Sequence, residues 1–299
     1  NLPSKRQIHS FLPRWHYKLG AALAGLALTL MLTSAPAQAA TIPVDNTTCT
    51  LVDAITAANT DTATGGCSVG SSVDTLELQG NVTLVNAIGF AGLPEIASVI
   101  TINGNGFTIA RAAGAPDFVI VSVAGSGNLT LNATTISGGR LGSGGGIFNQ
   151  GTLTLNNSTV SGNTAPLDGA SSNGGGINNV GTATLNNSTV SGNIARNGGG
   201  ISSFGTLTLN NSTLSGNTGE SGAGLRVRIG TATLNNSIVA NQAAGADCDG
   251  TLTSAGYNLD SDGSCGLAAT GDIPSGMANL GPLQVNAPGN TATHALGAG

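Results

Sequence analysis

Gly151-Thr152-Leu153-Thr154-Leu155-Asn156-Asn157-Ser158 is the stretch that decides the fold, because the chain repeats it. Related copies begin at Gly181, Gly205 and Gly230, and an earlier copy runs from Asn128 to Asn132. The second leucine of the copies falls at residues 131, 155, 185, 209 and 234, so the steps are 24, 30, 24 and 25 residues. The long step contains an insertion at 166–169. A regular step of this length predicts a solenoid, in which each repeat packs on its neighbours.

Within each copy, apolar and polar residues alternate with a period of two. Leu153 and Leu155 are expected to face inward, and the threonines before them outward, which is the pattern of a β-strand. A second short strand ends each copy, and Gly and Asn turns join the strands. These features predict an all-β fold, a right-handed parallel β-helix with one coil per repeat. A leucine-rich repeat is the alternative of similar length, but it requires Asn where this copy has Ser158.

Asparagine recurs at two fixed positions of the repeat. The first position, at a strand end, holds Asn132, Asn156, Asn186, Asn210 and Asn235. The second position, at a turn, holds Asn163, Asn193, Asn217 and Asn241. Side-chain amides stacked in this way can bond to the rungs above and below, and Asn tolerates left-handed turns. The sequence therefore predicts two amide ladders along the solenoid.

The regions on either side of the repeats are expected to close the ends of the solenoid. Residues 75–127 resemble less regular rungs, so the β-helix is assigned to 75–245, with an N-terminal cap at 40–74 and a tail at 246–299. Thr50 to Asp53 resemble a helix capping box, which predicts a helix in the cap. The cysteines form two local pairs, Cys49 with Cys67 and Cys248 with Cys265. In an exported protein these pairs predict disulfides, one at each end.

The first 39 residues are typical of a secretory signal. Four basic residues precede an apolar run at 19–32, and an Ala-x-Ala site ends at Ala39, after which cleavage is expected. The apolar run is short for a membrane span, although an uncleaved anchor helix is the alternative. Beyond residue 39 the chain has five arginines, no lysine and all 14 acidic residues, a net charge of −9. An acidic surface repels phosphate backbones, so no nucleic-acid partner is expected.

Several motifs resemble those of bacterial surface proteins. Residues 49–55, Cys-Thr-Leu-Val-Asp-Ala-Ile, are similar to the Cys-Ser-Leu-Arg-Glu-Ala box of one N-terminal domain, with departures at Thr50, Val52 and Asp53. The glycine-led rungs resemble the repeats of polymorphic-outer-membrane-type and pectin-lyase-like β-helix proteins. Residues 257–265, 280–283 and 293–296 resemble a choice-of-anchor tail, which continues further in such proteins, so we expect a truncated chain. The resemblance implies a β-helix that is secreted or displayed at the cell surface or outer membrane.

Pectin-lyase-like β-helices include polysaccharide lyases and hydrolases, which use clustered ionisable residues. Between residues 129 and 241, the acidic residues are Asp168 and Glu220, with Arg196 from the rung between them. Rungs about 4.8 Å apart would separate the two carboxyls by about 10 Å, just beyond the spacing of inverting glycosidases. The interpretation we favour is a solvated loop with weak ion pairs. His294 has no triad partner nearby in sequence and is expected to pack in the tail.

Two further patterns carry candidate binding residues. Asp260-Ser261-Asp262-Gly263 hints at a calcium loop but lacks the later Glu, so a turn closed by Cys248 and Cys265 is the favoured interpretation. No cofactor is expected. The second pattern is a set of threonine pairs that should form two parallel files on one outer face, namely Thr152, Thr154, Thr182, Thr184, Thr206, Thr208, Thr231 and Thr233.

The threonine files admit more than one interpretation. Thr suits a solvated strand face in any case. A flat array can also order water, as in ice-binding proteins that look similar locally. The prediction we prefer is a structural or adhesive surface protein that binds glycans or another cell surface. The alternatives are a polysaccharide lyase or glycoside hydrolase, and a water-ordering protein. A membrane would be involved only through export or through a missing C-terminal anchor.

Overall fold

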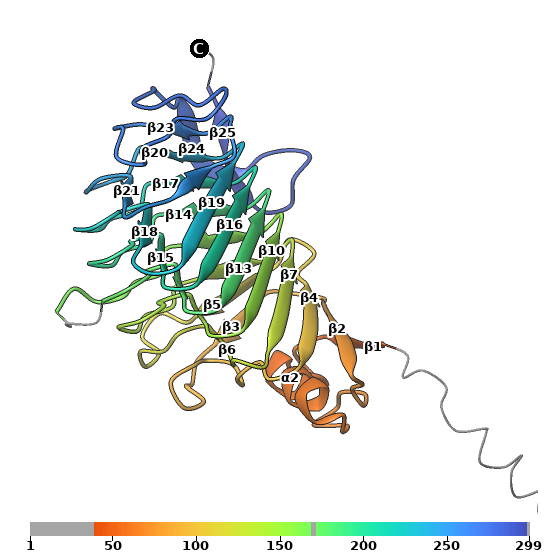
Figure 1. Cartoon of the computed structure of the whole chain (residues 1–299). Coiled ribbons are helices and arrows are strands. Elements are labelled where there is room, and N and C mark those ends of the chain that lie inside the picture. The colour runs from red at the N-terminus through yellow and green to blue at the C-terminus, as the bar shows by residue number, and fades with distance from the viewer. Residues whose placement is uncertain (1–38, 169–171, 298–299) are drawn as a thin grey trace, which may run out of the picture. The chain divides into compact units, whose positions relative to one another are not determined.

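The computed structural model describes residues 39–168 and 172–297, and these form a parallel β-helix (Figure 1). The predicted signal segment lies outside the described residues except for Ala39. The coil winds in the predicted right-handed sense, with one strand of each of three parallel sheets in a regular turn. The leucine-rich-repeat alternative is wrong, because the described residues of the coils, 129–168 and 172–241, form strands and turns without helices.

The largest sheet has nine strands and contains the first strand of each repeat. Its strands, in spatial order, are β1 (Ala40–Val44), β2 (Val73–Leu78), β4 (Val99–Asn103), β7 (Asn128–Asn132), β10 (Thr152–Asn156), β13 (Thr182–Asn186), β16 (Thr206–Asn210), β19 (Thr231–Asn235) and β22 (Thr253–Ser254). The chain order and the spatial order agree, so each coil lies on the one before it.

The other two parallel sheets complete each coil. The eight-stranded sheet consists of β3 (Val82–Leu84), β5 (Thr108–Arg111), β8 (Thr135–Ser137), β11 (Thr159–Ser161), β14 (Thr189–Ser191), β17 (Thr213–Ser215), β20 (Ile238–Ala240) and β23 (Leu259–Asp260). The six-stranded sheet consists of β6 (Val121–Val123), β9 (Ile147–Asn149), β12 (Ile177–Asn179), β15 (Ile201–Ser203), β18 (Leu225–Val227) and β21 (Cys248–Asp249).

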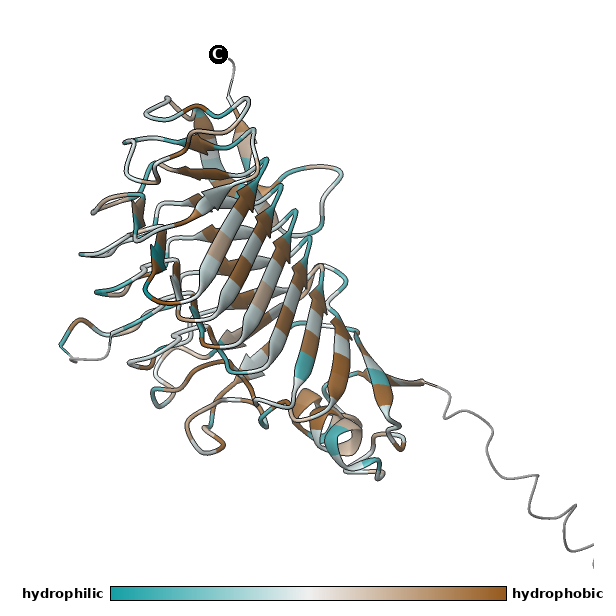
Figure 2. Ribbon diagram, in the orientation of Figure 1, coloured by the Kyte–Doolittle hydropathy of each residue, from teal (hydrophilic) through white to brown (hydrophobic). Residues whose placement is uncertain are grey.

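The strands pair in register, so like residues stack on like. Leu155 of β10 pairs with Leu185 of β13, and Leu185 pairs with Leu209 of β16. These leucines have 0% of their surface exposed, whereas Thr152 at the start of β10 is exposed. The predicted inward leucines and outward threonines are therefore confirmed. Figure 2 shows the same alternation as hydrophobic and paler bands across the strands of the nine-stranded sheet.

The first asparagine ladder is confirmed from Asn132 to Asn210 and begins earlier than predicted, but among the described residues its amide bonds do not reach Asn235. The Asn156 amide donates to Asn132 Oδ1 and the Asn186 amide to Asn156 Oδ1, each over 2.9 Å. The same chain of bonds extends through Asn103 to the carboxylate of Glu77. The left-handed backbone falls on the next residue instead, at Asn157, Asn187, Asn211 and Asn236, with φ of 48–49°.

The second ladder differs from the prediction at its last member. Asn163 donates to Asn193, and Asn193 to Asn217, over 3.0 Å in each case. Asn217 then donates to Gln242 Oε1 over 3.2 Å, so Gln242 takes the place predicted for Asn241. The amide of Asn241 turns outward and donates to Ala278 O. The shift occurs because this coil is one residue longer than its neighbour, which moves the next polar side chain into the column.

The predicted N-terminal helix is present as α2 (Leu51–Thr60). Thr50 is its N-cap, and the Thr50 hydroxyl accepts a hydrogen bond from the Asp53 backbone over 3.1 Å. Leu51, Ile55 and other apolar residues of one helix face are buried in the core of the solenoid. The helix therefore covers apolar residues that the first coil would otherwise expose, as a solenoid end requires. Strand β1 precedes the helix in the chain but already belongs to the nine-stranded sheet.

The inner columns change character at the C-terminal end. In β21, Cys248 pairs with Leu225, and in β22, Ser254 pairs with Leu234. In β23, Asp260 pairs with Val239. The last coil thus has polar or disulfide-bonded side chains where earlier coils have aliphatic ones. It leaves little apolar surface that a further coil of the same kind would have to cover.

Both predicted disulfides form, and each lies at one end of the solenoid. Cys49 is bonded to Cys67 and Cys248 to Cys265, and the paired residues are 18 and 17 positions apart. Beyond the second bond, β24 (Leu280–Val285) and β25 (Ala292–Leu296) form an antiparallel hairpin. The hairpin folds back along the eight-stranded sheet, where Thr159 donates to Ala292 O over 2.7 Å.

We predict that the two faces of one strand respond very differently to a charge. Leu185→Asp places a carboxylate without a partner in the core and should lower the free energy of unfolding by at least about 3 kcal/mol. Thr184→Asp, one residue earlier on the outer face, should change it by about 0.5 kcal/mol. Thermal melts of both variants test this, and equal destabilisation would contradict the inside–outside register.

We predict that reduction of the disulfides loosens the ends and spares the middle. Each closed loop is short, so each bond should stabilise its end by about 3 kcal/mol in the chain-entropy treatment. End units of a solenoid open at lower free energy than central ones. Hydrogen exchange with and without reductant should show lost protection near residues 49–67 and 248–265. A uniform loss across 150–215 would be inconsistent with this account.

Candidate functional site

The outer face of the nine-stranded sheet carries a file of threonines that runs through every strand. The strand registers place them side by side in the order Thr41, Thr75, Thr101, Thr130, Thr154, Thr184, Thr208, Thr233 and Thr253. The sequence repeats predicted four of these nine. The others were missed because the strands that bear them have irregular neighbours in the sequence, and only the register reveals the match.

Two further files flank the central one and complete the surface. On one side stand Thr152, Thr182, Thr206 and Thr231, in register with each other. On the other side stand the asparagines of the first ladder. Among the outward residues of the nine-stranded sheet from β1 to β19, Glu77 is the one charged side chain. We call this three-file surface the threonine face.

The geometry of the threonine face is set by the sheet itself. Neighbouring strands lie about 4.8 Å apart, and alternate residues along a strand are about 6.7 Å apart. The asparagine amides from Asn132 to Asn210 are occupied by their ladder, whereas the hydroxyls of the central and flanking threonines have no hydrogen-bond partner within the described part of the chain. The face therefore offers a regular, uncharged lattice of hydroxyl groups to whatever lies against it.

The candidate acid–base residues lie on an exposed edge. Arg196 forms an ion pair with Glu220, with 3.4 Å from Nε to Oε2, and their side chains are 37% and 67% exposed. Arg196 also donates to Leu167 O over 2.7 Å. Asp168 is exposed in the turn that precedes the undescribed residues 169–171. Screened ion pairs of this kind contribute little free energy, so this arrangement agrees with the favoured solvated-loop interpretation.

His294 packs in the tail, as predicted. Its Nε2 lies 2.9 Å from Ser191 Oγ on β14, and its Nδ1 lies 2.7 Å from Gly281 O in the hairpin. The Nε2 contact therefore holds the hairpin to the eight-stranded sheet, and the Nδ1 contact joins the two strands of the hairpin.

The weak calcium candidate gains a third carboxylate that the sequence did not reveal. One oxygen each of Asp247, Asp260 and Asp262 lies within 4.8 Å of the others. Carboxylate oxygens are the ligands that calcium prefers. These oxygens also accept hydrogen bonds, from the Ser261 backbone to Asp247 and from the Cys265 backbone to Asp260. The hydrogen bonds account for the cluster as the polar turn that ends the solenoid.

Burial changes the acidity of this cluster. Desolvation raises the pKa of Asp247 above its ordinary value, although hydrogen bonds from Ser261 oppose it. At Asp262, burial alone would raise the pKa, but hydrogen bonds from Ser264 and from the Asp247 backbone outweigh it, and the pKa is lowered. The two neighbouring carboxyls therefore ionise at different pH.

The fold defines the class of protein, a parallel β-helix, but similarity to known proteins adds no family. No family profile, no curated protein and no solved structure matches this chain. Among the described residues, no helix is long and apolar enough to cross a membrane.

We predict that Asp247 contributes a specific pH dependence of stability. Because its folded-state pKa is raised, the folded chain binds the proton more tightly than the unfolded chain. The free energy of unfolding should therefore fall as pH rises from the ordinary value of 3.8 through the raised value. Asp247→Asn, neutral throughout, should lack this fall, whereas Asp168→Asn at an exposed carboxyl should retain it. Denaturant titrations across this range provide the measurement, and an unchanged profile in Asp247→Asn would refute the assignment.

Proposed function

We propose that this chain is an exported cell-surface protein with a structural or adhesive role, and that it binds neutral polysaccharide through the threonine face. The observation that carries the proposal is the central file of threonines on all nine strands, whose hydroxyls have no partner among the described residues. A soluble domain needs a polar surface but has no need for the same residue at the same place in every coil.

Export is supported by the covalent chemistry of the chain. Two disulfides close short loops, and such bonds persist in oxidising compartments outside the cytosol. The basic and apolar pattern before Ala39 is that of a secretory signal. A covalently closed solenoid suits a surface role because its ends, the places where it would open first, are held shut.

The chemistry of the threonine face favours a neutral, extended ligand. A nearly charge-free face provides no steering for an anionic polymer, and the chain beyond residue 39 has a net charge of −9. Hydroxyls can both donate and accept, so they match the hydroxyls of a neutral sugar chain. Because the hydroxyls of the threonine face repeat both along the strands and across them, a polysaccharide can form many weak contacts at once. Such multivalent binding gives avidity without a deep pocket.

The same lattice supports one other role, the ordering of water at an ice surface. The observation that favours it is again the regular hydroxyl spacing, fixed by the strands in both directions. The two roles are distinguished by what the protein binds, which is ice in one case and polysaccharide in the other. A water-ordering protein should slow ice recrystallisation at micromolar concentration without retaining polysaccharide, and an adhesin should behave in the opposite way.

We predict that insoluble neutral polysaccharide retains the purified protein and that the threonine face is responsible. Cellulose, chitin and mannan should be tested as pellets. The double variant Thr184→Val/Thr208→Val keeps β-branched shape but removes two hydroxyls, and should weaken retention about tenfold if each hydrogen bond is worth about 0.7 kcal/mol.

The matched control for this experiment lies on a different sheet. Thr135→Val changes an outward threonine of β8 on the eight-stranded sheet and should leave retention unchanged. Equal loss in the control, or full retention by the double variant, would remove the threonine face from consideration. Soluble sugar fragments that appear with wild type and vanish with Glu220→Gln would instead establish the hydrolase or lyase alternative.

A further inference from the structure

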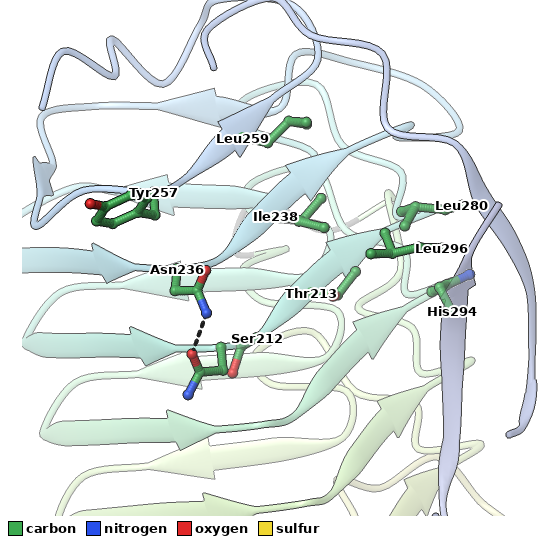
Figure 3. Close-up of a pocket in the computed structure, with 10 residues that line it drawn as sticks. Ser212, Thr213, Asn236, Ile238, Tyr257, Leu259, Leu280, His294 and Leu296 are labelled. Atoms are coloured by element: carbon green, nitrogen blue, oxygen red, sulfur yellow. Dashed lines mark hydrogen bonds between the residues drawn. The ribbon is translucent and has the colours of Figure 1, made fainter. Parts of the chain in front are cut away.

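A second site of a different kind lies near the C-terminal end, on the outer face of the eight-stranded sheet. The structure has a groove of about 440 Å³ there, bounded by the sheet and the hairpin. Figure 3 shows Tyr257 at one end, Leu280 and Leu296 of the hairpin at the other, and Ile238 and Leu259 between them. A volume of this size falls within the usual range of ligand pockets, about 300–1,000 Å³.

The repeat changes its chemistry where the groove forms. The first outward position of the eight-stranded sheet is threonine on five successive strands, at Thr108, Thr135, Thr159, Thr189 and Thr213. The next two strands place Ile238 and Leu259 at the same position. These apolar side chains are only partly buried, because the hairpin leaves the groove open over them. The substitution therefore creates an apolar floor beneath a solvent-filled space.

The residue at the left-handed turn also changes, in the coil that contains Leu259. This turn holds Ala133 in one earlier coil and Asn in the four coils after it, up to Asn236, whose backbone N–H donates to Gly256 O. The next residue in the column is Tyr257, with φ of 58°. A bulky aromatic residue is strained at such a φ, whereas Asn tolerates it.

The Tyr257 ring is fixed in place without being buried. The backbone of Gly271 lies directly against the ring, and a Cβ at that glycine would come within 2.4 Å of Cδ1. The side of the ring away from Gly271 remains open, and the residue is 64% exposed. An exposed ring held against backbone is a rigid platform, which lowers the entropy lost when a ligand stacks on it.

The polar groups of the groove are amides rather than charges. Asn236 donates to Asn211 Oδ1 over 2.6 Å (Figure 3). This bond leaves the Asn236 Oδ1 and the Asn211 amide group without partners among the described residues, so one acceptor and one donor remain for a ligand. His294 uses both ring nitrogens to hold the hairpin. The lining contains no Asp, Glu, Lys or Arg.

We propose that this groove binds a neutral pyranose unit, which stacks on Tyr257, hydrogen-bonds to the amides of Asn211 and Asn236, and lays an apolar edge on Ile238. A pyranose combines an apolar C–H face with a rim of hydroxyls, and the groove offers a complement to each. The proposal is independent of the role of the threonine face, because the groove lies on another sheet and accommodates a single sugar.

The chain provides its own reporter for this test. Tyr257 and Tyr17 are its two tyrosines, so ¹³C labelling of tyrosine rings yields at most two signal sets, and Tyr257→Phe identifies the set that belongs to the groove. The full chain is titrated with the methyl glycosides of glucose, galactose, mannose and N-acetylglucosamine. At least one glycoside should shift the Tyr257 signals with a saturable, millimolar dependence. A monomeric glycoside cannot span the threonine files, so this result does not depend on binding there.

Three variants make the assignment specific. Tyr257→Asn restores the residue of the preceding coils, so it should melt no lower than wild type while glycoside affinity falls at least tenfold by saturation-transfer NMR. Tyr257→Phe should retain affinity within about twofold, because a ring without the hydroxyl still stacks. Asn236→Gly accepts the positive φ and removes the amide, and should weaken binding several-fold.

Three results would overturn the proposal. One is that no glycoside shifts the Tyr257 signals up to molar concentration. Another is that Tyr257→Asn binds as wild type does. The third is that a trileucine peptide produces the saturable shift and no glycoside does, which would make the groove a peptide-docking site.

Discussion

In-register stacking of parallel strands is the constraint on which the rest of this structure depends. Each coil lies on the one before at a fixed separation. A side chain therefore contacts its counterpart in the next coil whether that contact is stabilising or destabilising. The inward columns must therefore be aliphatic, as at Leu155 and Leu185, and a buried polar column must bond to itself. The amide ladder from Asn163 to Asn193 satisfies that requirement, as does the buried contact of Asn149 with Asn179.

The ends of the solenoid are where stacking has no second partner, and each end is closed by different means. At the N-terminus, helix α2 lays an apolar face on the core, and the bond between Cys49 and Cys67 holds the loop after it. At the C-terminus, Asp260 enters an inner column and accepts backbone hydrogen bonds from the turn beyond it. A buried carboxylate is costly unless it is bonded in this way, so the same side chain stops the repeat and stabilises the turn.

Regular and irregular surfaces have different capacities for binding. The threonine face repeats the hydroxyl group many times, at spacings along and between the strands that the sheet fixes. It therefore suits a ligand that is itself a repeating polymer. The groove beside the hairpin depends on single departures from the repeat, at Tyr257, Ile238 and Leu259, and suits one small molecule. In a solenoid, a residue that breaks its column without a packing reason is therefore a stronger indication of a site than a residue that follows it.

The sequence alone determined the solenoid, the inward leucines, the outward threonines, the capping helix and the pairing of the cysteines, because periodicity and short loops are local information. Only the tertiary structure decided which residues meet at the irregular ends. It placed Asp247 beside Asp260 and brought His294 of the folded-back hairpin against Ser191. These contacts depend on the path of a chain segment that no longer repeats. No pattern within the sequence records that path, so the groove that it creates could not be predicted.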